Sequence, residues 1–204
     1  SDDSSINAKL LIQAGFIDQV MAGAYTYLPL GLRVLNKIEN IVRQKMNAIG
    51  VEVLMPAVVP TELWEKTGRL DTVDVLGQVT AANAAAKAKN DGRYVISPTH
   101  EEVITPLAQK FVTSYKDLPC GYYQIQTKFR NEPRAKSGLL RCREFRMKDL
   151  YSFHVSEEDL KKYYEQSKDA YWSMYEALGI KNDTFIVKAS GGDFTKDYSH
   201  EFQL

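Results

Sequence analysis

Apolar side chains recur at helical spacing in two stretches near the start of the chain. The first stretch, residues 6–20, predicts a helix that Gly15 weakens near its end. The second carries one apolar stripe from residue 32 to residue 49 and predicts a longer helix, which Gly50 ends. The sequence therefore predicts two amphipathic helices before residue 50.

Shorter segments carry weaker patterns. Apolar or β-branched runs predict strands at residues 25–28, 51–55, 93–97 and 185–187, and short helices are predicted to begin near Thr61, as its cap, and Thr99. Residues 81–89 are rich in alanine and predict a marginal helix in a mobile insertion. Ser156 and Asp159 form a capping box, which predicts a helix from there to about Leu178.

The most regular alternation lies in residues 122–132. Tyr, Ile, Thr and Phe at odd positions alternate with Gln, Lys, Arg and Glu at even positions, which predicts a strand. A second strand-like run, residues 141–153, follows a polar loop, and together they predict an antiparallel hairpin. Because no βαβ alternation occurs, we expect an α+β fold, an antiparallel sheet flanked by helices that pack on one side.

Charged side chains on one face of this hairpin form a first candidate site. On a strand, Arg141 and Phe145 would lie about 13 Å apart, a span that suits a terminal phosphate and a stacked base. Arg130 could hold an inner phosphate, and Glu132 could accept from an exocyclic amine. The alternative is a solvated charged face with no ligand, and spacing alone leaves both open.

Residues 98–102 (Pro-Thr-His-Glu-Glu) form a second candidate site. Thr99 can be merely a helix cap and Glu101 can merely complement the helix dipole. The functional alternative has both side chains reaching a ligand ammonium. The three histidines (His100, His154 and His200) lack metal-ligand spacing, so we expect no protein-bound metal site.

Composition narrows the class of protein. The 204 residues include 26 basic and 26 acidic side chains, which argues against binding nucleic acid through overall charge. Two cysteines indicate a reducing compartment, and no apolar run reaches the ~20 residues of a membrane span. We therefore expect a cytoplasmic protein that makes no membrane contact.

Several motifs resemble those of one family. Residues 129–132 (Phe-Arg-Asn-Glu) and 141–145 (Arg-Cys-Arg-Glu-Phe) resemble motif 2 of the class II aminoacyl-tRNA synthetases. Residues 146–154, 98–102 and 25–33 resemble the prolyl-tRNA synthetases within that class. The resemblance covers nearly the whole chain and implies a partial class II catalytic domain over residues 1–204. It places motif 1 at about 32–60, a proline-binding loop at 97–102 and motif 2 at about 122–154.

The resemblance implies ATP-dependent activation of L-proline to prolyl-adenylate and transfer to tRNA(Pro), by a homodimer that associates through motif 1. Mg²⁺ would accompany ATP as the substrate complex. Arg130 would be catalytic and would bridge the proline carboxylate and the α-phosphate. The implied proline-binding residues are Thr99, Glu101, Arg130, Met147 and His200; the implied ATP-binding residues are Arg130, Glu132, Arg141 and Phe145; Arg134 and Lys136 would face the tRNA acceptor end.

Some features depart from the family pattern. Motif 3 and the anticodon-binding domain are absent from residues 1–204, so we expect this chain alone to be a weak catalyst. Gly191 and Gly192 come earlier than the family's Gly-Gly-Ser stretch. Two other functions stay open, a catalytically inactive synthetase-like module that binds tRNA or a nucleotide, and a stand-alone deacylase of mischarged tRNA, whose characteristic segment is missing.

Overall fold

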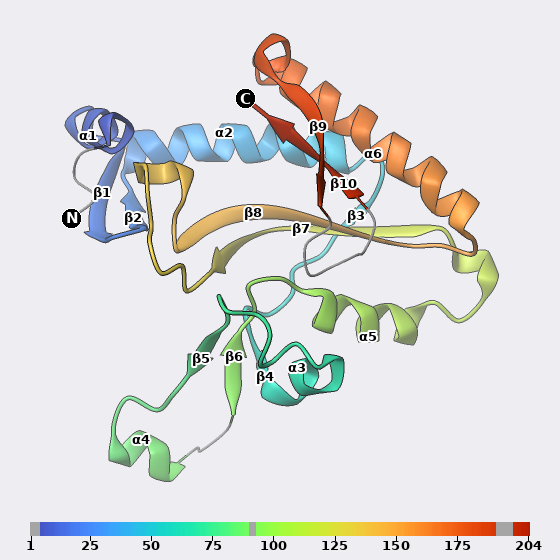
Figure 1. Ribbon diagram of the computed structural model, residues 1–204, viewed down its shortest axis with the longest axis horizontal. Helices are drawn as coiled ribbons and strands as arrows, with labels where there is room; N and C mark the ends of the chain where they lie inside the picture. The colour runs from blue at the N-terminus through green and yellow to red at the C-terminus, as the bar shows by residue number, and fades with distance from the viewer. Residues whose placement is uncertain (1–4, 90–92, 191–197) are drawn as a thin grey trace.

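A two-stranded hairpin is the centre of the molecule. The computed structural model describes residues 5–89, 93–190 and 198–204. Strands β7 (Cys120–Phe129) and β8 (Glu144–Phe153) pair antiparallel along their whole length, and β3 (Val51–Glu52) adds to β7 in parallel. Helices α2 (Pro29–Met46) and α6 (Glu157–Ala177) cover one side of this sheet, and α5 (Glu101–Phe111) lies on the other (Figure 1).

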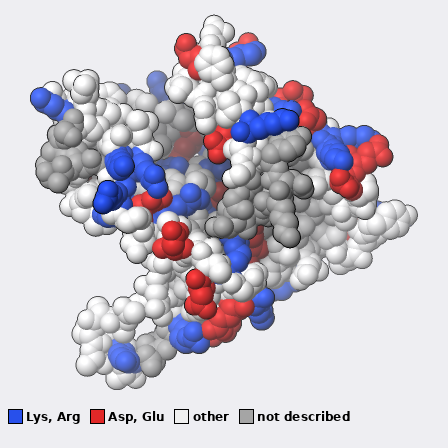
Figure 2. Space-filling view, viewed as in Figure 1, with Lys and Arg blue, Asp and Glu red and all other residues white. Residues whose placement is uncertain are grey.

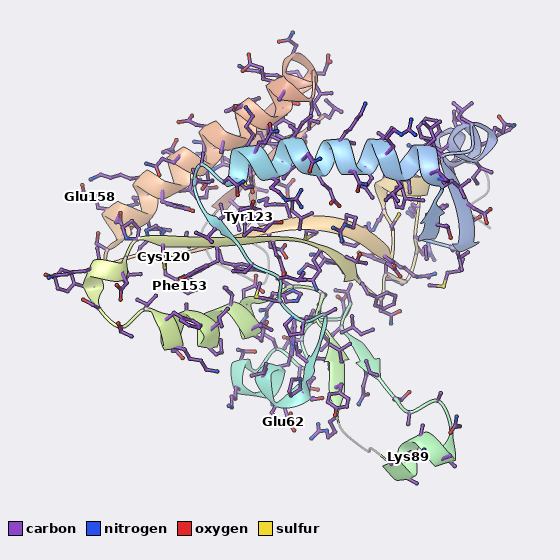
Figure 3. All side chains as sticks on the ribbon, turned by 180° about the vertical axis from the view of Figure 1, so that it is seen from behind. Glu62, Lys89, Cys120, Tyr123, Phe153 and Glu158 are labelled. Atoms are coloured by element: carbon purple, nitrogen blue, oxygen red, sulfur yellow. The ribbon has the colours of Figure 1, made fainter. Side chains whose placement is uncertain are left out.

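The α2 and α6 side of the sheet is an apolar core. Met46, Tyr123 and Ile125 are buried there, and Leu150 packs against them. Tyr123 points from β7 toward α2 (Figure 3), where its hydroxyl donates to Asn47 Oδ1 at 2.6 Å. The odd positions of β7 therefore hold the sheet against the helices, as the alternation predicts.

The N-terminal segment differs from its prediction. Helix α1 ends at Gln13 (Ile6–Gln13), and β1 (Ile17–Met21) pairs with β2 (Ala24–Tyr27), so the predicted helix to residue 20 is wrong beyond α1. Gly15 has φ 70°, which stops the helix, and the apolar residues after it alternate across a hairpin.

A smaller sheet lies below the hairpin, in the order β4–β6–β5. Its core is made by Val59, Trp64 and Val95. Thr61 begins α3 as its first helical residue, but it is not the cap: Pro60 precedes the helix and the Thr61 hydroxyl has no partner among the described residues. The elements of this part are β4 (Val58–Pro60), α3 (Thr61–Thr67), β5 (Gly77–Val79), α4 (Ala84–Lys89) and β6 (Tyr94–Ile96).

The C-terminal part of the described chain is α6 followed by a two-stranded ribbon. Ser156 caps α6 by accepting from the Asp159 N–H at 3.2 Å, which is one half of the predicted capping box; the Asp159 carboxylate pairs with His154 at 2.9 Å. Strands β9 (Phe185–Ser190) and β10 (Tyr198–Gln203) pair antiparallel, and residues 191–197, where the family pattern is broken, lie outside the described residues. The short 3₁₀ helices are η1 (Tyr115–Asp117), η2 (Gly138–Leu140) and η3 (Lys181–Asp183).

The fold class is α+β with antiparallel sheets, as predicted, but helices lie on both sides of the central hairpin. Other elements pack against both faces of β7, because the side chains at its even positions Gln124 and Lys128 are as buried as that of Tyr123. The charged face that the sequence predicts is therefore open only at the end of the hairpin that carries the β7–β8 loop. None of the helices in the described ranges is long and apolar enough to cross a membrane.

Candidate functional site

The turn between β6 and α5 places one of two neighbouring carboxylates toward solvent. The Thr99 hydroxyl donates to Glu101 Oε2 at 2.5 Å. Glu102 is buried, and its Oε1 accepts hydrogen bonds from Thr67 Oγ1 at 3.1 Å and from Arg69 Nη1 at 2.8 Å. Glu101, in contrast, lies 3.4 Å from Arg69 and keeps 37% of its side chain exposed. Glu101 is therefore the carboxylate that can meet a ligand, and Glu102 holds the turn to α3.

Arg130 joins this turn to the hairpin. Its Nε and Nη2 each lie 3.4 Å from the Pro98 carbonyl oxygen, and Nη2 lies 3.9 Å from Met147 Sδ. The guanidinium lies 5.5 Å from the centre of the Phe145 ring. The structure thus brings Thr99, Glu101, Arg130, Met147 and Phe145 to one edge of the sheet.

A cavity of about 370 Å³ continues from Arg130 to the far side of the β7–β8 loop. Four of the residues predicted for a nucleotide line it, namely Arg130, Glu132, Arg141 and Phe145. Arg141 donates to Glu132 Oε2 from Nη2 at 2.8 Å and from Nε at 3.2 Å, with 60% of the arginine side chain exposed. The cavity is lined by three arginines (Arg130, Arg141 and Arg146) and two aromatic residues (Tyr27 and Phe145), side chains that suit phosphate and base.

Arg141 reaches the cavity from a different position than predicted. Strand β8 begins at Glu144, and the backbone of Arg141 instead pairs with Lys136 in an isolated bridge. The 13 Å separation expected from strand geometry therefore does not apply. The irregular loop, whose polar residues prevent continued pairing, folds back so that Arg141 and Phe145 face the same hollow.

The N-terminal hairpin supports this loop, which sequence reasoning missed. Arg143 donates from Nε to the Glu132 carbonyl at 2.8 Å and from Nη1 to the Ala22 carbonyl at 3.0 Å, and its backbone N–H donates to Gly23 at 2.8 Å. A Cβ on Gly23 would lie 2.8 Å from the Arg143 nitrogen. The glycine therefore permits the close approach.

Basic side chains gather over this loop, as Figure 2 shows. Arg134 and Lys136 are exposed there, outside the cavity lining. The structure leaves both side chains accessible to a polyanion.

The structure does not bring His200 to the other predicted residues. Its Nδ1 lies 2.9 Å from the Tyr164 hydroxyl on α6, and it shares a hollow with Leu150 and Ser152. These even positions of β8 point to the α6 side, whereas Met147 points to the opposite side. The expectation that His200 lines the proline pocket with Met147 is therefore not met, because successive residues of β8 point to opposite faces and His200 lies on the α6 face.

Sequence reasoning also missed a buried polar group beneath the turn. Lys128 Nζ lies 2.5 Å from Asp149 Oδ2 and also contacts His100 Nδ1. Burial lowers the pKa of His100, and Lys128 lowers it further; burial also lowers the pKa of Lys128, which Asp149 opposes. Burial raises the pKa of the neighbouring Tyr151 hydroxyl. The signal was the run of polar even positions in β7, which we interpreted as either a nucleotide-binding face or a solvated face, not as a buried one.

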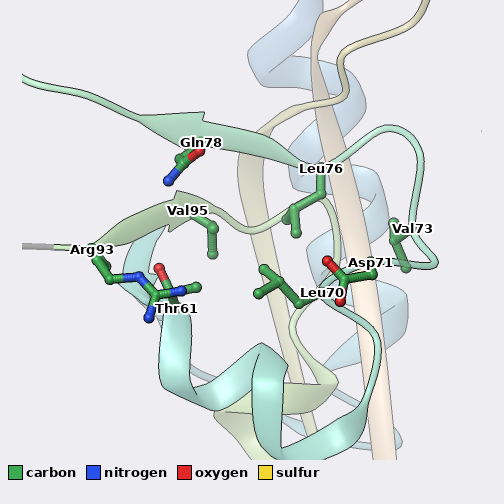
Figure 4. Close-up of a pocket in the computed structure, with 8 residues that line it drawn as sticks. All are labelled: Thr61, Leu70, Asp71, Val73, Leu76, Gln78, Arg93 and Val95. Atoms are coloured by element: carbon green, nitrogen blue, oxygen red, sulfur yellow. The ribbon is translucent and has the colours of Figure 1, made fainter.

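A second hollow, of about 310 Å³, lies in the smaller sheet and contains none of the predicted site residues (Figure 4). Arg93 at its edge is paired with Glu65 at 2.7 Å. Within the described ranges, no three His, Cys, Asp or Glu side chains form a group that could hold a metal ion. The lining residues are Thr61, Leu70, Asp71, Val73, Leu76, Gln78, Arg93 and Val95.

Comparisons with known proteins agree on one family. Residues 85–204 match the model of the tRNA synthetase class II core domain (G, H, P, S and T). The chain is 51% identical over 193 residues to a proline–tRNA ligase of Sulfurihydrogenibium sp. (strain YO3AOP1) and 50% identical over 194 residues to one of Persephonella marina (strain DSM 14350 / EX-H1). Each match covers 94% of this chain and 33% of the relative, so the chain spans about a third of their length.

Solved structures show the same fold. The prolyl-tRNA synthetase of Cryptosporidium parvum, complexed with L-proline and AMP, superposes with a TM-score of 0.79 at 18% identity. That of Giardia lamblia, complexed with prolyl-adenylate, superposes with a TM-score of 0.81 at 22% identity. The matches cover 96% and 95% of this chain, and 40% of each of those chains.

Proposed function

The chain belongs to the family of class II tRNA synthetase core domains, and from this we propose that it provides the proline site and part of the ATP site of a proline–tRNA ligase. The reaction would join L-proline to ATP as prolyl-adenylate, release pyrophosphate and pass the prolyl group to tRNA(Pro). The observation that carries the proposal is Arg130, which touches the turn of Thr99 and Glu101 on one side and the cavity of Arg141 and Phe145 on the other.

The two halves of this site suit the two substrates. Glu101 is the anion that the imino cation of proline needs as a partner. The Thr99 hydroxyl lies within hydrogen-bonding distance of the Glu101 carboxylate. In the cavity, Phe145 would stack on adenine, Glu132 would accept from its amine, and Arg141 would meet the terminal phosphate. Met147 contacts Arg130 and would line the proline pocket. His200 is left out of the proposed pocket because it lies on the α6 side.

Arg130 has the catalytic role in this proposal. A proline carboxylate that attacks the α-phosphate in line accumulates negative charge on the phosphate oxygens. A guanidinium fixed between turn and cavity would stabilise that charge without reorganising. Mg²⁺ would arrive with ATP, and the exposed Arg134 and Lys136 would meet the phosphates of the tRNA acceptor end.

This function is tested by measuring ligand binding to the chain. Calorimetry is carried out separately with L-proline, with ATP and with a non-hydrolysable prolyl-adenylate analogue. We expect the analogue to bind much more tightly than either substrate, and Arg130→Ala to weaken it by ~10²-fold or more. Binding of ATP alone, with no effect of proline or of its adenylate, would favour the inactive nucleotide-binding module. Binding of none of the three ligands would refute the proposal.

The proposal includes a homodimer formed through motif 1. Leu32, Val34 and Ile38 on α2 are exposed, as are Val51 and Leu54 after it, so this region leaves several apolar side chains uncovered. A two-fold contact would bury these side chains on both copies. Sedimentation should show a dimer at micromolar concentration, and a monomer at high micromolar concentration would contradict it. The proposed place of action is the cytoplasm, where the thiols of Cys120 and Cys142 would stay free, as they are in the structure.

A further inference from the structure

Three ionisable side chains are packed together beneath the turn that carries Thr99 and Glu101. The Lys128 side chain is 0% exposed and the Asp149 side chain 11%. His100 is 1% exposed, and its Nδ1 contacts the Lys128 ammonium. Burying such groups is costly unless each finds a partner, so their presence needs an explanation.

The contacts of His100 fix its protonation. Its Nε2 lies 3.0 Å from the Pro56 carbonyl oxygen, which can only accept, so Nε2 carries the hydrogen. Its Nδ1 then accepts from Lys128. Protonation of the ring would place a hydrogen on Nδ1, where it would point at the positively charged Lys128 ammonium and be repelled. The geometry therefore requires a neutral imidazole in one tautomer, in agreement with the lowered pKa.

The same group connects four segments of the chain. The His100 backbone N–H donates to the Tyr151 hydroxyl on β8 at 3.0 Å. Gln124 on β7 donates to Asp149 at 3.2 Å and accepts from the Met55 N–H at 3.2 Å. His100 is thus bonded to β7, to β8 and to the segment after β3, while Thr99 and Glu101 on either side of it face the site.

We propose that His100 is a positioning residue for the amino-acid half of the site, held by the Lys128–Asp149 pair. The pair orients the neutral imidazole, and the imidazole holds the turn so that Thr99 and Glu101 keep their places opposite Arg130. The identity of the ligand, L-proline, rests on the proposed function; the positioning of the turn does not.

A solely structural role makes a different prediction. If the group only stabilised the fold, its loss would weaken binding of both substrates together. Positioning confines the loss to proline, because the ATP cavity is lined by residues of the β7–β8 loop, the start of β8, β2 and α2, and by no residue of the turn. The ratio of the two affinities therefore distinguishes the roles.

The first experiment is independent of any ligand. Imidazole ¹⁵N resonances of the chain should show His100 with hydrogen on Nε2, a bare Nδ1, and a titration displaced to lower pH than that of an ordinary histidine. Amide exchange at Thr99 and Glu101 should be faster in His100→Gln than in the parent, relative to the amides of β7. A His100 with an ordinary titration, or unchanged exchange in the turn, would overturn the positioning.

The second experiment measures L-proline and ATP binding separately in His100→Gln and His100→Asn. Glutamine can keep the bond to Pro56 but loses the acceptor for Lys128, whereas asparagine places Oδ1 near the position of Nδ1. We expect His100→Gln to weaken proline binding about tenfold or more and ATP binding less than twofold, and His100→Asn to recover part of the loss. Equal losses for both ligands would show a structural role.

His154→Gln is the matched control. His154 is also largely buried, and its ring bonds to Asp159 and Ser152 at 2.9 Å on the α6 side of β8. Its loss should lower stability without changing the ratio of proline to ATP affinity. If the parent chain binds neither substrate, the proposed function fails, and the ¹⁵N and exchange results still decide whether His100 positions the turn.

Discussion

The two halves of the candidate site are built in different ways. The turn that carries Thr99 and Glu101 is packed on a buried group, in which Lys128 has no exposed side-chain surface. The β7–β8 loop is largely exposed, and its main side-chain contact within the cavity is the ion pair of Arg141 with Glu132, whose arginine is 60% exposed. The amino-acid half is therefore fixed before a ligand arrives, and the nucleotide half is held by a contact that a ligand can replace.

This difference has a functional consequence. A turn that is packed on buried, hydrogen-bonded side chains loses little entropy on binding, which favours selection among small ligands that differ by a few atoms. Arg141 must leave Glu132 to meet a phosphate, so part of the nucleotide's binding energy is spent on that change. We infer that selectivity for the amino acid is set by rigid geometry and that the nucleotide site forms as ATP binds.

The largest effect should come from breaking the buried pair. Lys128→Met leaves the Asp149 carboxylate and His100 Nδ1 without their donor, and we expect the free energy of unfolding to fall by about 3–5 kcal/mol. Arg141→Met removes an exposed pair and should cost about 1 kcal/mol or less. Urea unfolding, followed by the fluorescence of Trp64 and Trp172, measures both. Equal losses in the two variants would remove the contrast between buried and exposed halves.

The next largest effect should be on the binding of L-proline, the ligand of the amino-acid half of the site. Glu101→Gln keeps the shape of the side chain and removes its charge, so we expect L-proline binding to weaken by about 2–5 kcal/mol while ATP binding changes little. Glu158→Gln on the exposed start of α6 is the control and should change neither. Calorimetry with each ligand decides, and a comparable loss of ATP affinity would mean that Glu101 supports the whole site.

The sequence predicts the exposed half of the site better than the buried half. The predicted alternation of residues 122–132 places Arg130 and Glu132 on one face, and the predicted second strand adds Arg141 and Phe145; all four line one cavity. Lys128 follows the same alternation, but a charged residue normally indicates a solvated face. Its burial depends on His100, 28 residues earlier, which no local pattern links to it.

Two other errors have the same physical origin. Residues 17–21 fit helical spacing as well as strand alternation, and only pairing with residues 24–27 decides between them. The position of His200 depends on how β10 crosses α6, a contact made with Tyr164 far away in the sequence. Local patterns therefore predict the elements, and long-range packing determines which face each side chain meets.

A smaller effect should come from the exposed half. Arg141→Ala removes a donor to a phosphate, so we expect ATP to bind about 1.5–3 kcal/mol less tightly, the usual value of a hydrogen bond to a charged group. L-proline binding should not change, because Arg141 does not touch the turn. Arg134→Ala, on the same loop but outside the cavity lining, is the matched control for ATP. An equal effect of the two substitutions would show that only the charge of the loop matters.

The smallest effect is a pH dependence that only the buried half should show. The pKa of His100 is lowered by burial and by Lys128, against the opposing effects of Asp149, Glu101 and the Pro56 carbonyl. Well above pH 6.5, the ordinary pKa of histidine, the imidazole is neutral both folded and unfolded, and stability does not depend on its protonation. Below that pH the unfolded chain takes up a proton that the folded chain does not, so the free energy of unfolding falls until the pH reaches the folded pKa.

Comparison with His100→Asn isolates this contribution, because asparagine does not titrate and the other histidines are present in both proteins. We expect the unfolding free energy of the parent, relative to the variant, to be constant well above pH 6.5 and to fall as the pH is lowered from there toward the folded pKa of His100. Urea unfolding from pH 5 to 8 gives this difference. A difference that stays constant across the range, or that grows in acid, would mean that His100 becomes protonated in the fold, and the buried half would then not be the fixed, neutral support that its hydrogen bonds describe.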